Sequence, residues 1–283
     1  MGKLALAAKV THVPSMLISE MPGKHQGCRD FAIEGHREIG RRARELGVDT
    51  FVVLDTHWLV NSGYHINANA RHRGIYTSTE FPHFIRDLEY DYQGNTALGE
   101  SIAAKATAKG VLTRAHSGVE SLGLEYGTLV PMKYMNEEAD ISVVSIGGWV
   151  YSAEMEESQA VGEAIREAVE ESDRCVALLA SGSLSHRIWD NREVEDGLFK
   201  ISKPFNKEVD LMVLDMWQEG RIAEFIDMLP DYAKNCSGEG NMHDTAMLFG
   251  ALGWDNYTGK GEMLHQYFES SGTGQCNVVF PVM

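Results

Sequence analysis

Alternating apolar and polar stretches divide the start of the chain into two strands with a helix between them. Residues 4–10 and 50–54 are short apolar runs that each lead into a polar segment containing a histidine, a pattern that predicts buried strands. Between them, five side chains recur at helical spacing: Ala32, His36, Ile39, Ala43 and Leu46. Gly47 then stands where a helix C-terminal glycine belongs. This part of the chain is predicted as strand, helix, strand.

The same alternation returns further along the chain. Residues 141–146 and 175–180 predict strands that flank a helix with one apolar stripe, formed by Val161, Ala164, Ile165, Ala168 and Val169. Two amphipathic helices are expected at residues 204–218 and 243–252, and a final strand at residues 275–282. In the helix at 204–218 the predicted apolar face consists of Phe205, Val209, Met212, Val213 and Met216.

This order of elements favours an α/β fold, with a mainly parallel or mixed central sheet covered by helices on both faces. The chain has 283 residues, of which 43% are hydrophobic, enough to bury a sizeable core. Because no repeat, low-complexity tract or flexible linker interrupts the pattern, residues 1–283 are expected to form a single catalytic domain.

The formal net charge of -16 makes nucleic acid or an anionic membrane an unsuitable partner, so a small molecule is expected. An anionic substrate would need a local cationic pocket. The apolar stretch at the N-terminus is too short for a signal peptide, and no later segment is apolar for a bilayer's thickness. A soluble, cytoplasmic protein is therefore expected. Four cysteines without a C-x-x-C pair are interpreted as reduced structural thiols: Cys28, Cys175, Cys236 and Cys276.

Three of the eleven histidines follow predicted strands, namely His12, His57 and His186. Ligands of open α/β sheets bind outside the carboxyl ends of the strands, and neutral imidazoles suit iron, zinc, copper and nickel. A single histidine in such a loop is nevertheless more often a hydrogen-bonded loop residue than a ligand. Six further histidines fall in stretches expected to be solvated loops or helix surfaces: His25, His36, His65, His72, His83 and His265.

Other catalytic motifs are absent from the sequence. There is no H-E-x-x-H of a metalloprotease helix. The string from Gly182 to His186 ends in histidine where the nucleophile elbow of a serine hydrolase needs glycine. Gly272-Thr273-Gly274 precedes a predicted strand instead of following one and lacks a third glycine, so it is interpreted as a turn.

Five segments, in order along the chain, carry a resemblance to a known family. They are Lys-Val-Thr-His12-Val-Pro-Ser-Met, Asp-Thr-His57-Trp, Leu-Glu125-Tyr126-Gly-Thr-Leu-Val-Pro, Ala-Ser-Gly-Ser-Leu-Ser-His186-Arg and Gly-Glu239-Gly-Asn-Met-His243-Asp. Together they strongly resemble the class III extradiol ring-cleavage dioxygenases and span nearly the whole chain. Many members of that family have a histidine where this chain has Tyr126, and the branch that acts on homoprotocatechuate is similar to this chain in having tyrosine there.

The resemblance implies a non-haem Fe(II) enzyme. Carried over to matching positions, it implies His12, His57 and Glu239 as iron ligands and His116 and His186 as the acid and base. Two imidazoles and a carboxylate on one face leave positions open for a bidentate catecholate and dioxygen. Zinc prefers four ligands and has no redox chemistry, so a zinc-loaded protein should be inactive.

The implied reaction inserts both atoms of O2 and cleaves the ring of 3,4-dihydroxyphenylacetate, giving a 2-hydroxymuconic-semialdehyde-type product. Tyr126 and Arg187 are the candidates for substrate binding, and a homo-oligomer is expected because symmetric assembly is common. Two alternatives stay open: a Memo-like non-catalytic binding protein on the same fold, and a zinc hydrolase that uses the same three ligands.

Overall fold

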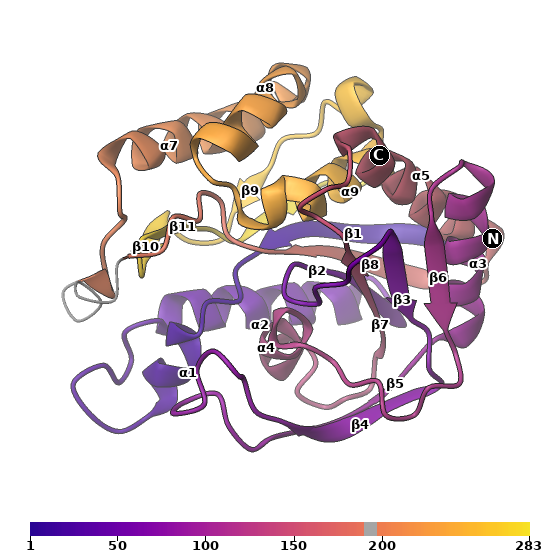
Figure 1. Ribbon diagram of the computed structural model, residues 1–283, viewed down its shortest axis with the longest axis horizontal. Helices are drawn as coiled ribbons and strands as arrows, with labels where there is room; N and C mark the ends of the chain where they lie inside the picture. The colour runs from indigo at the N-terminus through magenta and orange to yellow at the C-terminus, as the bar shows by residue number, and fades with distance from the viewer. Residues whose placement is uncertain (190–196) are drawn as a thin grey trace.

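The centre of the computed structural model, which describes residues 1–189 and 197–283, is a twisted sheet (Figure 1). In the described residues this sheet has eight strands, in the spatial order β6 (Thr113–His116), β3 (Tyr64–Asn67), β7 (Ser142–Gly148), β2 (Thr50–Asp55), β8 (Cys175–Ser181), β1 (Lys3–Val10), β12 (Val278–Phe280) and β9 (Glu262–Met263). The four central strands β7, β2, β8 and β1 are parallel to one another, whereas β12 and β9 run antiparallel to their neighbours. The sheet is therefore mixed, with a parallel centre.

Side chains of the central strands alternate between two apolar layers, as the period of a strand requires. On one face Val52 and Leu54 of β2 pack with α3 (Thr96–Ala108), α5 (Met155–Glu171) and α9 (His243–Leu252), and the same layer extends to α7 (Pro204–Glu219) and α8 (Ile222–Asn235). On the other face Phe51 and Val53 pack with α2 (Asp30–Glu45) and α4 (Tyr126–Met135). Figure 1 shows α2 and α4 on one side of the sheet and α9 on the other. The predicted fold class is confirmed.

Smaller elements border the carboxyl ends of the parallel strands or cover an outer face. Helix α1 (Ser15–Glu20) follows β1 directly, and β4 (Arg71–Tyr76) pairs with β5 (Leu88–Gln93) as a separate hairpin. The short strands β10 (Phe268–Ser270) and β11 (Thr273–Gln275) form another hairpin, and the 3-10 helices are η1 (Glu239–Met242) and η2 (Trp254–Asn256). Gly47 after α2 has a φ of 73°, the left-handed conformation predicted for this glycine.

Two predictions about local structure are wrong. The single closing strand at residues 275–282 is divided into β11 and β12, because Asn277 between them turns its side chain to the backbone of Thr11. Helix α7 is rotated relative to its predicted face: Phe205 and Met212 are 54% and 40% exposed, while Asp210 and Trp217 are buried. Asp210 is buried because it accepts hydrogen bonds from three hydroxyl groups, those of Ser185, Tyr232 and Tyr267.

Two histidines expected at the surface are also buried, for reasons of hydrogen bonding. His36 lies between the carbonyl of Thr11 and the side chain of Asn277, and burial lowers its pKa to about 4. His72 is 2.9 Å from the carbonyl of Val143 through Nε2. Burial also lowers the pKa of His72, so both rings are neutral at pH 7, and each makes a hydrogen bond to a backbone carbonyl. Among the described residues, no helix is long and apolar enough to cross a bilayer.

Candidate metal centre

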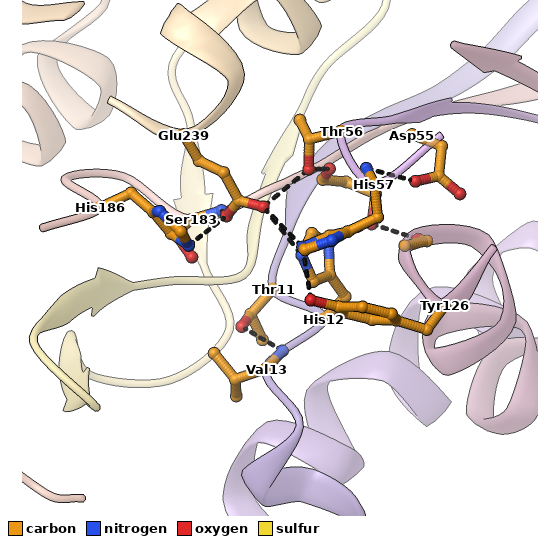
Figure 2. Close-up of polar contacts among 12 residues, drawn as sticks. Thr11, His12, Val13, Asp55, Thr56, His57, Tyr126, Ser183, His186 and Glu239 are labelled. Atoms are coloured by element: carbon orange, nitrogen blue, oxygen red, sulfur yellow. Dashed lines mark hydrogen bonds and ion pairs between the residues drawn. The ribbon is translucent and has the colours of Figure 1, made fainter. Parts of the chain in front are cut away.

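Two histidines and a glutamate meet at the carboxyl edge of the parallel strands. His12 lies two residues beyond β1, His57 two residues beyond β2, and Glu239 begins η1 from a distant part of the chain. The Nε2 atoms of His12 and His57 are 3.0 and 3.3 Å from the same carboxylate oxygen, Oε1 of Glu239 (Figure 2). The structure thus brings together the three residues that the family resemblance implied as ligands, and their ligand atoms all lie within 4.8 Å of one another.

The orientation of the His12 ring is set by Ser181, the last residue of β8. Ser181 donates its only hydroxyl proton to the carbonyl of Gly127, so toward His12 its oxygen can only accept. His12 Nδ1, 2.9 Å from that oxygen, must therefore carry the ring proton. The lone pair of the neutral ring is then on Nε2 and faces Glu239, which is the arrangement of a metal-binding imidazole.

A tight turn after β2 positions His57. One oxygen of Asp55 accepts the backbone N–H of His57 at 2.8 Å and that of Trp58 at 3.2 Å, and its other oxygen accepts the hydroxyl of Thr128 at 2.6 Å. The ring Nε2 then points to Glu239 and to the hydroxyl of Tyr126, 2.7 Å away. Burial alone would lower the pKa of His57, but the nearby carboxylates of Glu239 and Glu80 outweigh it and raise the pKa to about 10.

The Glu239 carboxylate is buried and held by hydrogen bonds to both of its oxygens. Thr56 donates its hydroxyl to Oε1 at 2.7 Å, and the backbone N–H of Ser183 donates to Oε2 at 2.5 Å. Burial would raise the pKa of this carboxyl, but the facing rings of His12 and His186 keep it well below the usual range. Glu239 is therefore an anion whose charge is directed at the two histidines.

The backbone behind Glu239 adopts an uncommon conformation. Gly240, Asn241 and Met242 have φ values of 51°, 50° and 63°, so three successive residues are left-handed. Each non-glycine residue in this region costs about 1–2 kcal/mol. The Asn241 side chain, which donates to the carbonyl of Val150 at 2.7 Å, and the fully buried Met242 hold the turn in place. Such strain persists only where surrounding contacts maintain it. In this turn the strained backbone directs the Glu239 carboxylate toward the two histidines.

The donor set of His12, His57 and Glu239 fits a metal ion. With its proton on Nδ1, a neutral His12 presents a lone pair on Nε2, which lies 3.0 Å from Oε1 of Glu239, and a cation at this position could bind both atoms. Two imidazole nitrogens and one carboxylate oxygen on one side of a site suit divalent transition metals. The three residues could therefore hold one such ion and leave its other side open.

A cavity of about 210 Å³ opens beside these residues. Its wall includes the rings of His12, His57, Tyr126 and His186. Apolar side chains also line it, among them those of Phe81, Phe84, Ile188 and Leu198. A cavity of roughly 150 Å³ accommodates benzene, so this one has room for a single substituted aromatic ring. A wider groove of about 910 Å³ beside α7 contains none of the three candidate ligands. The smaller cavity is the candidate site.

His186 lies on the cavity wall, its Nε2 3.9 Å from Oε2 of Glu239 (Figure 2). The neighbouring Ser185 is bonded to the buried Asp210 through both its backbone N–H and its hydroxyl, at 3.2 and 2.7 Å, and this fixes the loop. Burial lowers the pKa of His186. A neutral imidazole at pH 7 can accept a proton from a ligand in the cavity.

Two other predicted site residues lie elsewhere in the structure. His116 ends β6 at the edge of the sheet, where its Nε2 is 2.8 Å from Nδ1 of His65. Arg187 is exposed. Among the described residues, neither is part of the cavity wall, and the acid–base role of His116 and the substrate contact of Arg187 stay predictions.

Several residues of the site were not identified from the sequence. Ser181 bonds to His12, and Thr56 and Ser183 bond to Glu239. Glu80 lies 3.7 Å from His57 and accepts the Tyr126 hydroxyl at 3.1 Å. Hydroxyl residues beside histidines after a strand were the one available signal. It is weak, because serine and threonine are common in loops of every kind.

Comparisons with known proteins agree on the family of this chain. Residues 6–281 match the family described as the catalytic LigB subunit of aromatic ring-opening dioxygenase. The chain is 55% identical to a 3,4-dihydroxyphenylacetate 2,3-dioxygenase of Escherichia coli, over 92% of this chain and 94% of that one. It is 26% identical to the 2-aminophenol 1,6-dioxygenase beta subunit of a Pseudomonas species, over 98% and 93% of the two chains.

A solved structure supports the fold alone. The uncharacterized protein JW3007 of Escherichia coli K12 superposes with a TM-score of 0.65 at 14% sequence identity, covering 97% of this chain and 99% of that one. At this identity the likeness concerns the arrangement of helices and strands only.

Proposed function

The chain belongs to the family of LigB catalytic subunits of aromatic ring-opening dioxygenases, and from this membership we propose that it is an extradiol dioxygenase that cleaves 3,4-dihydroxyphenylacetate beside its two hydroxyls. The observation that carries the substrate is the 55% identity, over nearly the whole of both chains, to an enzyme named for that reaction. The proposed product is a 2-hydroxymuconic-semialdehyde-type compound, with both atoms of O2 incorporated.

We assign His12, His57 and Glu239 as the ligands of an iron(II) ion. Their convergence at one edge of the sheet and the proton on Nδ1 of His12 support this assignment. When bound, the iron would supply the electron transfer between catechol and dioxygen. Zinc held by the same ligands would not, because it has no redox chemistry.

Residues of this chain would bind the ring and move its protons. The aromatic and aliphatic wall of the cavity suits an aromatic ring, and water has little room beside one in about 210 Å³. His186 is placed to take a proton from a substrate hydroxyl at Nε2 and to return it to an oxygen of the product. Tyr126, whose hydroxyl lies at the same end of the cavity as His57, is assigned to hydrogen bonding with a catechol hydroxyl.

Oxygen uptake by purified protein of known metal content tests the proposal. We expect iron-dependent uptake with 3,4-dihydroxyphenylacetate and a much higher kcat/KM for it than for unsubstituted catechol. Equal efficiency would overturn the substrate while leaving ring cleavage intact. Binding of catechols without uptake by the iron-loaded protein would favour the Memo-like alternative, and hydrolytic activity with zinc would favour the hydrolase.

Two further predictions from the sequence accompany this function. A homo-oligomer is still expected, and light scattering coupled to size-exclusion chromatography would measure it. The relative from Pseudomonas is named as a beta subunit, which makes assembly with a second chain the informative contrary result. A cytoplasmic location also stays a prediction, to be checked by cell fractionation.

A further inference from the structure

One part of the cavity wall consists of hydroxyl groups. Ser15 begins α1 and Ser270 ends β10, and their two Oγ atoms are 3.1 Å apart. Both side chains are buried and both line the cavity that His12 and His57 also line. Ser15 follows His12 by three residues, so their Cα atoms are at most about 11 Å apart. The hydroxyl pair is therefore within the length of a small aromatic ligand from the candidate metal ligands.

The guanidinium of Arg29 is a buried cation that is hydrogen-bonded to Ser15 of this pair. Arg29 is only 3% exposed and donates from Nε to Ser15 Oγ at 3.0 Å. A terminal nitrogen of the same guanidinium donates to the carbonyls of Leu198 and Glu269, at 3.3 and 2.9 Å. Burial lowers the pKa of Arg29 to about 10, so the group is still charged at neutral pH. Its flat faces pack against the rings of Phe199 and Phe268, with distances of 4.8 and 4.7 Å to the ring centres.

The chemistry of arginine determines how many hydroxyl protons Ser15 and Ser270 can donate to a ligand. A guanidinium only donates, so Ser15 Oγ accepts from Arg29. Two hydroxyl protons remain, one on Ser15 and one on Ser270, and the bond between the two serines uses one of them. Whichever serine donates, the other keeps a proton for which the described part of the protein supplies no acceptor. A ligand in the cavity can therefore accept it.

We propose that the hydrogen-bonded residues Arg29, Ser15 and Ser270 form the recess that binds the anionic side group of the substrate. This inference rests on the proposed function and names the part of the cavity that selects a carboxylate-bearing catechol. The positive charge polarises both hydroxyls toward the cavity, and a hydrogen bond to a carboxylate is stronger than one between neutral groups. Arg29 is thus a positioning residue that acts through Ser15, while the free hydroxyl touches the substrate.

The charges around the cavity agree with this assignment. The protein as a whole repels anions, with a net charge of -16, so an anionic substrate needs a local source of positive potential. Glu80 also lines the cavity, but it accepts the Tyr126 hydroxyl and faces His57, on the side of the candidate metal ligands. In 3,4-dihydroxyphenylacetate the two hydroxyls and the carboxymethyl group are at different ends of the ring, so one ligand carries both the groups assigned here to the histidines and the group assigned to the serines.

The test compares a carboxylate substrate with a neutral one of similar shape. In Ser270→Ala and Ser15→Ala, kcat/KM for 3,4-dihydroxyphenylacetate should fall about 10- to 100-fold, the usual effect of losing a hydrogen bond to a charged group. The value for 4-methylcatechol, which has no carboxylate, should change less than about threefold. Ser270→Thr keeps a hydroxyl and should retain most of the preference.

Ser19→Ala is the matched control. Ser19 is another buried serine of α1, and it accepts the backbone N–H of Arg29 at 2.9 Å but contacts neither the guanidinium nor the cavity. Its removal should leave the substrate preference at the wild-type value. Arg29→Met should lower the preference for the carboxylate substrate as Ser270→Ala does. The double variant with both substitutions should lose no more of this preference than the stronger single variant, because both residues act through the same series of hydrogen bonds.

Binding without turnover separates this inference from the proposed function. Dissociation constants for 4-hydroxyphenylacetate and 4-methylphenol, measured by calorimetry without oxygen, should show the same loss of carboxylate preference in Ser15→Ala and Ser270→Ala. If the wild type cleaves neither catechol, the proposed function fails and this pair still tests the recess. If both serine variants keep the wild-type preference, or weaken both ligands equally, the recess assignment is wrong and Arg29 only joins α2 to β10.

Discussion

Ser181→Ala should weaken metal binding without removing any metal ligand. The substitution deletes the oxygen that accepts the Nδ1 proton of His12 at 2.9 Å, at a fully buried position. In the metal-free protein the His12 ring can turn or change tautomer to relieve the unpaired N–H. With metal on Nε2 it cannot, so the cost falls mainly on the metal-bound state. An unpaired buried donor costs about 1–3 kcal/mol.

Loss of such a partner of a ligating histidine typically lowers metal affinity about 10- to 100-fold, or about 1.4–2.8 kcal/mol, which agrees with that cost. Ser181 also donates to the carbonyl of Gly127, but that bond is lost equally with and without metal. Loss of this bond should therefore lower the melting temperature of the metal-free protein. It should leave the metal affinity unchanged, because it destabilises the metal-free and metal-bound states equally. Competition for zinc(II) with a chromophoric chelator measures the dissociation constant, and repetition with iron(II) under nitrogen extends the result to the proposed metal.

Ser158→Ala is the control for this experiment. Ser158 is also a buried serine bonded to a histidine, His243, at 2.7 Å, but on α5 and outside the candidate metal centre. It should lose stability and keep its metal affinity. A folded Ser181→Ala protein that binds metal within about twofold of the wild type would refute the role assigned to Ser181.

Three further outcomes are expected. His186→Ala should keep its metal while kcat falls about 10²- to 10⁴-fold, whereas His12→Ala should lose metal and activity together; metal analysis beside steady-state rates checks both. Metal binding should release about one proton, because His57, with a pKa raised to about 10, is protonated in the metal-free protein at pH 7 and must become neutral to bind metal. The metal affinity should therefore rise about tenfold per pH unit up to that pKa. A metal affinity that stays constant between about pH 7 and 9 would contradict this. Lys9→Met should lower the free energy of unfolding by about 3–5 kcal/mol in a denaturant titration, because it leaves the buried carboxylate of Asp244 without its partner.

Local patterns were enough to predict the elements that form the centre of the fold. Strands β1, β2, β7 and β8 are continuous apolar runs because both of their faces are covered, and α2 and α5 show one apolar stripe because one face is buried. His12 and His57 could be identified as candidates since each follows such a run. These are properties of neighbouring residues, which a sequence displays directly.

The prediction failed where a distant contact outweighed the local pattern. Helix α7 buries Asp210 instead of Met212, because Ser185, Tyr232 and Tyr267 reach Asp210 from other parts of the chain. Hydrophobic periodicity treats an aspartate as a surface residue and has no means of counting partners it has not yet located. The same limit applies to His36, which was assigned to a solvated surface and lies buried against Thr11.

The family resemblance named Glu239 as a ligand, but only the tertiary structure decided what surrounds it. Thr56 and Glu239, which are hydrogen-bonded, are 183 positions apart in the chain. Ser181 can reach His12 because β8 pairs directly with β1, and strand order is a global property that no stretch of sequence displays. Hydrophobic burial is not directional and only requires that the strands be covered, so the hydroxyls that orient the ligands became visible once the order of the sheet was known.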